Sequence, residues 1–259
     1  MTETIIKYPR TPHLSGSRLG QGDEDLDKIQ FDNILGKQIV IEEKIDGANC
    51  GISFSSSGDL LLQNRGHFFY GGYRERHYDL FKQFANIRKA ELYSILGSRY
   101  IMYGEWMYAK HTVFYDALPD YFIEFDIYDK RERVFLDTAA RRSLIAQLSF
   151  KIHSVPILAT GMFTSQKSVL SHLGRSLYIT DSHLDNLARV ASDVGADLSE
   201  VFATTDNSKD MEGLYIKVEE GGEVRERVKF VRSTYVQSAA QDTSRWQSRI
   251  IIPNQLKKN

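Results

Sequence analysis

The sequence predicts an α+β fold in which antiparallel sheets are packed against helices, and three kinds of observation support this. Apolar and polar residues alternate over 38–44 and 48–54, as they do in half-buried strands. Turn sequences at 57–59 and 221–222 connect neighbouring strand patterns into hairpins. Segments with helical spacing lie between the strands, and this mixture is typical of an α+β domain.

The chain begins with a polar, glycine-rich stretch, residues 1–35, that we expect to form an irregular arm with one short helix. A single domain is expected over 36–233. Its strands are predicted at 38–44, 48–54, 60–64, 100–108, 121–128, 151–159, 213–219 and 223–231. The remaining tail, 234–259, contains Trp246 and an apolar run at 250–253, which we expect to pack back on the same domain.

Four segments are predicted to be helices: 78–96, 138–148, 165–173 and 181–194. Glycines follow three of them, at 97, 174 and 195, where a helix commonly ends. Asp137 or Thr138 is expected to cap the second helix, and Asp181 the fourth.

The composition is that of an ordinary globular protein with 42% apolar and 26% charged residues in 259. No apolar run is long enough to span a membrane, and no signal-peptide pattern is present, so a cytoplasmic location is expected. The only cysteine, Cys50, excludes a disulfide within the chain. The net charge of −1 means that binding to nucleic acid would require a local basic face.

The most informative feature is the tetrad Lys44-Ile45-Asp46-Gly47, which follows an alternating strand pattern. A lysine at the end of a half-buried strand is a candidate covalent nucleophile, because burial lowers the pKa of its amine. A neutral amine could then attack the α-phosphorus of a nucleotide. The alternative is a strand that ends in an ordinary Asp-Gly turn.

Further polar or aromatic residues stand at the ends of other predicted strands. They are Asn49, Arg65, Glu105, Phe125, Asp126, Glu212, Lys217 and Lys229. An unpaired carboxylate among apolar neighbours, as at Glu105, is costly and therefore points to a site.

In order and spacing these segments resemble the six nucleotidyltransferase motifs of ATP-dependent polynucleotide ligases. The tetrad is similar to motif I, and Arg65 is similar to the arginine of motif Ia. Residues 103–106 are similar to motif III, and residues 125–126 are similar to motif IIIa. Residues 212–217 are similar to motif IV, and residues 228–229 are similar to motif V. Asn49 and the Phe-Asp pair make the RNA ligase 2 type the most similar, over about residues 38–232. The resemblance implies a ligase adenylylation domain, related in fold to ATP-grasp proteins.

The resemblance also implies the reaction, in which an RNA 5′-phosphate is joined to a 3′-hydroxyl in RNA repair. A lysine attacks ATP to form lysyl-AMP, the AMP moves to the RNA 5′-phosphate, and the 3′-hydroxyl then displaces it. Carried over by resemblance, Lys44 is the nucleophile, and Asp46 and Glu212 hold Mg²⁺ or Mn²⁺ through water. Lys217 and Lys229 would contact the α-phosphate.

Five residues would bind the adenylate by the same resemblance. Glu105 would hydrogen-bond the ribose, and Phe125 would stack on adenine. Backbone groups of Glu43 would read adenine N6, while Asn49 and Arg65 would contact the adenylate or the RNA 5′ end.

Two departures from the family pattern leave questions open. Motif V usually has two lysines separated by one residue, but Val231 takes the second position here and Arg232 is the next cation. The chain also ends soon after motif V, without the OB-fold or helical domain of relatives. Either the minimal domain suffices, or the N-terminal arm or a helper protein supplies the RNA contacts. The role of His111, near motif III, stays open. So does the choice among nicked duplexes, broken tRNA loops and RNA–DNA junctions as substrate.

Two other functions are compatible with parts of this pattern. A GTP-dependent capping-type guanylyltransferase uses the same lysine chemistry, but the missing OB-fold argues against it. A non-catalytic RNA-binding module would not need to keep Lys44, Asp46, Glu105, Glu212 and Lys229 together.

Overall fold

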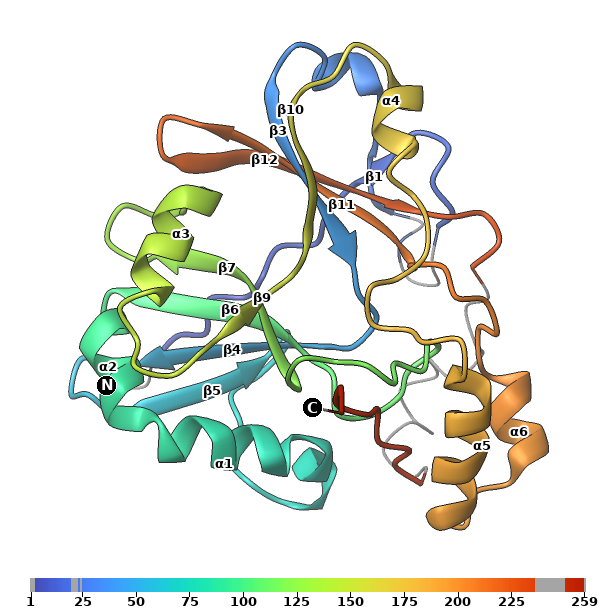
Figure 1. Cartoon of the computed structure of the whole chain (residues 1–259). Coiled ribbons are helices and arrows are strands. Elements are labelled where there is room, and N and C mark those ends of the chain that lie inside the picture. The colour runs from blue at the N-terminus through green and yellow to red at the C-terminus, as the bar shows by residue number, and fades with distance from the viewer. Residues whose placement is uncertain (1–2, 20–22, 24, 236–249, 259) are drawn as a thin grey trace.

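Two six-stranded sheets face each other in the computed structural model, which describes residues 3–19, 23, 25–235 and 250–258 (Figure 1). The first sheet has the order β10 (Ile157–Met162), β3 (Gln38–Lys44), β11 (Gly213–Glu220), β12 (Glu223–Val231), β1 (His13–Leu14) and β2 (Lys28–Ile29). Its four longer strands pair antiparallel, while β1 runs parallel to both of its neighbours. The predicted α+β fold with antiparallel sheets is confirmed.

The second sheet lies below the first in Figure 1. Its order is β5 (Leu60–Asn64), β4 (Ala48–Phe54), β6 (Tyr100–Trp106), β7 (Phe122–Asp129) and β8 (Val134–Phe135), with β9 (His153–Ser154) parallel to β7. The predicted strand 151–159 is in fact divided into β9 and β10. Pro156 stands between them, and a proline cannot donate a hydrogen bond to a continuing ladder.

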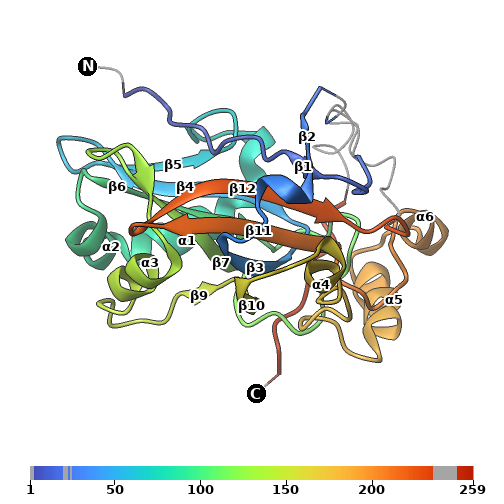
Figure 2. The same ribbon diagram turned by 90° about the horizontal axis from the view of Figure 1, so that it is seen from above.

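Helices cover the outer faces and one end of the two sheets (Figures 1 and 2). They are α1 (Asp79–Ile87), α2 (Lys89–Leu96), α3 (Thr138–Ile145), α4 (Gln166–Leu170), α5 (His183–Asp193) and α6 (Leu198–Ala203), with 3-10 turns at Phe31–Asn33 and Tyr73–Tyr78. The helix predicted over 78–96 is two helices that meet at Arg88. The helix α6 was not predicted.

The predicted helix caps are right in one case and wrong in another. The Asp137 carboxylate caps α3 by accepting a hydrogen bond from the backbone amide of Ala140. Asp181 does not cap α5, because its carboxylate pairs with Lys209 at 2.7 Å and Arg175 at 2.9 Å. These ion pairs tie the segment before α5 to neighbouring loops instead.

Alternation along β3 decides which residues face the space between the sheets. Ile39 and Ile41 are buried in an apolar cluster on the outer face of the first sheet. Side chains in a strand point alternately to opposite faces. Glu42 and Lys44 therefore point inward, toward the second sheet.

Both ends of the described chain pack on this framework. In the arm, β1 lies beside β12 with His13 opposite Lys229, so the arm is more regular than predicted. At the other end, the backbone amide of Lys110 donates to the carbonyl of Ile252 at 2.8 Å. Trp246 lies outside the described residues. Among the helices that the structure describes, none is long and apolar enough to cross a membrane.

Candidate active site

A cavity of about 800 Å³ opens between the two sheets. Strand ends from both sheets form its walls, and the N-terminal arm and residues 250–252 contribute to its rim. Most of the predicted site residues line it: Glu43, Lys44, Asp46, Asn49, Arg65, Glu105, Phe125, Glu212 and Lys229. The fold therefore gathers residues that are up to 186 positions apart, Glu43 and Lys229, around one space.

Lys44 ends β3 and lies opposite Gly213 of β11, next to Glu212. Its Nζ is 2.6 Å from the Glu212 carboxylate. Burial alone would lower the pKa of Lys44, but the carboxylates of Glu212, Asp46 and Glu105 outweigh this effect and raise it. The expectation that burial neutralises the amine is therefore wrong for the protein without nucleotide.

The glycine of the tetrad is required by close packing. A Cβ atom at Gly47 would lie 2.6 Å from the Met107 sulfur and 2.9 Å from both Glu105 Cγ and the Trp106 carbonyl oxygen. The Gly47 amide donates to the Glu105 carboxylate at 3.2 Å. Gly47 thus lets Glu105 approach the backbone of the tetrad.

Asp46 is held in place by backbone and side-chain donors. Its Oδ2 accepts hydrogen bonds from the amides of Thr112 at 2.7 Å and Val113 at 2.9 Å. Its own amide donates to the Tyr115 hydroxyl at 2.9 Å. The second oxygen, Oδ1, is 3.9 Å from Nδ1 of His111. These bonds fix one oxygen of Asp46 and keep the other near the cavity.

Three carboxylates surround the single ammonium of Lys44. Burial raises the pKa of Glu105 to about 8 and that of Glu212 to about 7, and the negative charge of Asp46 adds to both effects. Such an excess of oxygen donors suits Mg²⁺ or Mn²⁺. Among the described residues, no three metal-binding side chains are grouped to ligate an ion directly.

Lys229 lies on the arm side of the cavity. Its Nζ is 2.5 Å from the carboxylate of Asp23. The same carboxylate also contacts Nε2 of His13 at 3.0 Å. Burial lowers the pKa of Lys229, the nearby charge of Lys44 lowers it further, and Asp23 opposes both. In the protein without nucleotide, an acidic residue of the arm therefore occupies the place of an anion beside Lys229.

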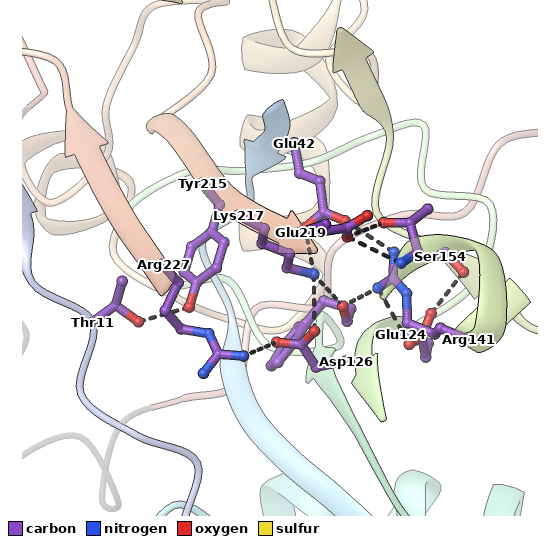
Figure 3. Close-up of polar contacts among 12 residues, drawn as sticks. Thr11, Glu42, Glu124, Asp126, Arg141, Ser154, Tyr215, Lys217, Glu219 and Arg227 are labelled. Atoms are coloured by element: carbon purple, nitrogen blue, oxygen red, sulfur yellow. Dashed lines mark hydrogen bonds and ion pairs between the residues drawn. The ribbon is translucent and has the colours of Figure 1, made fainter. Parts of the chain in front are cut away.

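Lys217 is only 1% exposed and lies among other polar side chains (Figure 3). Its Nζ is 2.9 Å from Glu42 and 3.0 Å from Asp126, and donates to the Phe125 carbonyl at 2.6 Å. It is not among the residues that line the cavity. A contact with the α-phosphate would require these interactions to break.

Figure 3 shows that Lys217 belongs to a buried cluster of charges that joins the two sheets. We call this set the inter-sheet ion cluster: Glu42, Glu124, Asp126, Arg141, Lys217 and Arg227. Arg141 of α3 pairs with Glu42 of the first sheet at 2.9 Å and with Glu124 of the second at 3.3 Å. The cluster contains three charges of each sign, which suits a permanently buried site.

Comparison with known families agrees with this geometry. A family model described as RNA ligase matches residues 37–231. The chain belongs to the RNA ligase family. A comparison with curated proteins gives no match.

Solved RNA ligases from Naegleria gruberi are similar to this chain. A mutant with ATP and Mn shares 17% identity over 90% of this chain and 58% of its own, with a TM-score of 0.50, which supports the fold. A structure with PPi, also 17% identical, covers 90% and 62% with a TM-score of 0.46. The present chain thus spans about three fifths of the length of these proteins.

The other predicted RNA ligase residues lie around the tetrad. Asn49 is opposite Glu105 in the β4–β6 pair, and its side-chain oxygen is buried without a hydrogen-bond partner in the described part of the chain. Arg65 donates to the Pro9 carbonyl at 3.1 Å. The Phe125 ring meets Tyr8 edge to face, with the ring centres 5.0 Å apart.

Glu43 and Arg232 have partners outside the cluster around Lys44. The Glu43 carboxylate accepts from the Ser176 hydroxyl at 2.5 Å, and its backbone amide donates to Pro156. Arg232 is buried and pairs with Asp206 at 2.7 Å. It is absent from the cavity lining, so the structure does not favour it as the missing cation of motif V.

Residues of the arm were not predicted to belong to the site. Tyr8, Thr11, His13, Arg18 and Asp23 all line the cavity. The arm reaches the cavity through pairing with β12, more than 200 residues later in the chain, and its two-residue strands have no alternating pattern.

Proposed function

We propose that the protein is an ATP-dependent RNA ligase that joins RNA 5′-phosphate and 3′-hydroxyl ends through lysyl-AMP and RNA-adenylate intermediates. The single observation that carries the proposal is the position of Lys44, which faces Asp46, Glu105 and Glu212 in a cavity that also holds Lys229. The membership of the RNA ligase family supports it.

The first step is attack by the Lys44 amine on the α-phosphorus of ATP. The N–P bond forms while the bond to the β-phosphate oxygen breaks, and pyrophosphate leaves with the electron pair. Lys44 must first lose a proton, and Glu212 at 2.6 Å is placed to accept it. A divalent ion held through water by Asp46 and Glu212 would supply positive charge beside the α-phosphate.

The remaining residues have roles that follow from their positions. Lys229 would exchange Asp23 for a phosphate oxygen. Glu105, whose pKa of about 8 keeps it largely protonated at neutral pH, could donate a hydrogen bond to the ribose. Asn49 has an unsatisfied side-chain oxygen in the described chain, and Arg65 lies at the rim, where either residue could meet the nucleotide or the RNA 5′ end. Phe125 offers an aromatic edge of the cavity for adenine.

The choice of cofactors rests on the same site. The oxygen-rich surroundings of Lys44 suit ATP with Mg²⁺ or Mn²⁺, and the Naegleria enzyme was solved with ATP and Mn.

The lone cysteine, Cys50, is buried and free, which fits a reducing cytoplasm.

The decisive experiment incubates the protein with α-labelled ATP or GTP and Mg²⁺ or Mn²⁺ and follows covalent labelling. We expect a labelled band with ATP that is absent from Lys44→Ala. Lys37→Ala is the matched control, because Lys37 is a surface lysine paired with Glu226. Absence of label with every divalent metal would disprove the proposal, and preference for GTP would favour the capping-type reaction.

Sealing assays then identify the substrate. The panel contains single-stranded RNA ends, nicked RNA duplexes and RNA–DNA junctions, each with a 5′-phosphate and a 3′-hydroxyl. Sealing by this chain alone would show that it needs no helper protein. Labelling without sealing of any substrate would show that RNA contacts come from a partner.

A further inference from the structure

The phosphate-binding side of the cavity has fewer strand cations than the family motif suggests. Of the cations on the described strands β11 and β12, Lys229 alone lines the cavity. The next positions do not add one, because Val231 is apolar and Arg232 is buried against Asp206. Once Lys44 has lost its proton, Lys229 and a divalent ion leave part of the negative charge of a triphosphate unbalanced.

The N-terminal arm brings one more cation to the same place. The Val231 amide donates to the Ser17 hydroxyl at 2.9 Å, and the Arg18 amide donates to the Val231 carbonyl at 3.0 Å. Arg18 is therefore fixed by its backbone to the last residue of β12. Its side chain lines the cavity.

The guanidinium of Arg18 differs from the amines of Lys44 and Lys229 in its partners. It donates to two backbone carbonyls, that of Ser233 at 3.1 Å and that of Tyr235. Within the described residues it forms no ion pair with a carboxylate, whereas Lys44 pairs with Glu212 and Lys229 with Asp23. Its charge is held in position and is not neutralised there.

Strand register places Arg18 and Lys44 on one line across the first sheet. Val231 is opposite Gly213, and Gly213 is opposite Lys44. Adjacent strands are about 4.8 Å apart. Arg18 lies beyond β12, so its backbone is about three spacings, roughly 14 Å, from that of Lys44. Two long side chains that reach inward from these positions can hold the two ends of a triphosphate.

We propose that Arg18 binds the β- and γ-phosphates of ATP and stabilises the pyrophosphate that leaves; this inference rests on the proposed ligase function. As the N–P bond to Lys44 forms, the electron pair of the broken bond moves to pyrophosphate, beside the Arg18 guanidinium. Arginine suits this role because its planar group binds two phosphate oxygens at once.

Loss of Arg18 is expected to affect the first step of the reaction and not the sealing step. Pyrophosphate is present only in the first step, so Arg18→Ala is expected to reduce kcat/KM for ATP in lysyl-AMP formation by about 10- to 100-fold. Sealing of an RNA strand that already carries the adenylate should change by less than about twofold, since no pyrophosphate takes part. Arg18→Lys should restore part of the first step.

Arg225→Ala is the matched control. Arg225 belongs to the same sheet, is half exposed and pairs with Glu223, away from the cavity. It should leave both steps unchanged. Thermal unfolding of each variant would report any general loss of structure.

A binding measurement tests the proposal without relying on catalysis. In the Lys44→Ala background, Arg18→Ala should weaken ATP binding by at least about tenfold and leave AMP binding unchanged. Equal losses for ATP and AMP, or no loss for either, would overturn the role of Arg18. Failure of the wild-type protein to form lysyl-AMP, with the ATP-specific loss intact, would overturn the ligase proposal alone.

Discussion

Replacing Gly47 with alanine would test why the tetrad ends in glycine. The added Cβ would lie 2.6 Å from the Met107 sulfur and 2.9 Å from Glu105 Cγ and from the Trp106 carbonyl oxygen. Non-bonded carbon atoms prefer about 3.5–4.0 Å, so each neighbour must move by half an ångström or more. Trp106 belongs to β6 and pairs with Ala48, so its backbone cannot shift easily.

The magnitude follows from the cost of overpacking, which is about 1–3 kcal/mol. For a chain of this size, 1 kcal/mol changes Tm by about 2–4 °C, so the expected loss is about 2–12 °C. If Gly47 were an ordinary turn glycine, its replacement with alanine would instead raise Tm. Gly47 is not among the residues with positive φ, and alanine at such a turn would stabilise the protein by about 0.4–1 kcal/mol.

Thermal unfolding followed by circular dichroism distinguishes these outcomes. Gly174→Ala is the control, because a Cβ there meets no atom within 4 Å and its φ is also not positive. Lysyl-AMP formation should fall in Gly47→Ala, since Glu105 is displaced. A Tm for Gly47→Ala equal to or above that of the wild type would refute the packing argument.

Three further predictions concern charge. In Glu212→Gln, fewer carboxylates oppose the effect of burial on the pKa of Lys44, so that pKa should fall. The pH profile of any remaining lysyl-AMP formation should then move to lower pH. An unmoved profile would contradict the assigned ion pair between Lys44 and Glu212. The pKa of Glu105 is raised to about 8, so the folded state binds the Glu105 proton more tightly than the unfolded state does. The stability that this proton contributes is lost as pH rises from about 4.5 to 8. Glu105→Gln should therefore raise Tm more at pH 8 than at pH 5 in a series of melting experiments. Arg141→Ala removes the ion pair of buried Glu124 and leaves buried Glu42 with Lys217 alone, so it should cost about 3–5 kcal/mol in urea unfolding. The exposed neighbour variant Arg142→Ala should stay within about 0.5 kcal/mol.

Much of the site could be predicted from sequence because its residues stand at strand ends. Lys44, Asp46, Glu105, Glu212 and Lys229 all follow or end strong strand patterns, and the fold brings them to one cavity. The longer strands were predictable from the sequence, but the two-residue strands β1, β2 and β8 and the division of 151–159 were not. The helix break at 88 was not, because the apolar spacing of 78–96 continues across it.

The rest depended on contacts between distant parts of the chain. Arg18 reaches the cavity only through hydrogen bonds to Val231, which no local pattern reveals. The burial of Lys217 depends on partners in β3 and β7, so its spacing within motif IV could not show that it is absent from the cavity lining. The raised pKa of Lys44 has the same origin, since its nearest carboxylate is 168 positions away in the chain, at Glu212.

The inter-sheet ion cluster has a consequence for how the cavity can be filled. Moving the two sheets apart would pull Arg141 away from Glu42 or Glu124, and Lys217 of the first sheet away from Asp126 of the second. Each separation would strand a charge in an environment with little water. The two sheets are therefore held rigidly at the inter-sheet ion cluster, and under the proposed function nucleotide would enter at the opposite, open rim. Dissolved salt screens buried ion pairs poorly, so the two sheets should keep their distance at ionic strengths that already weaken phosphate binding at the rim.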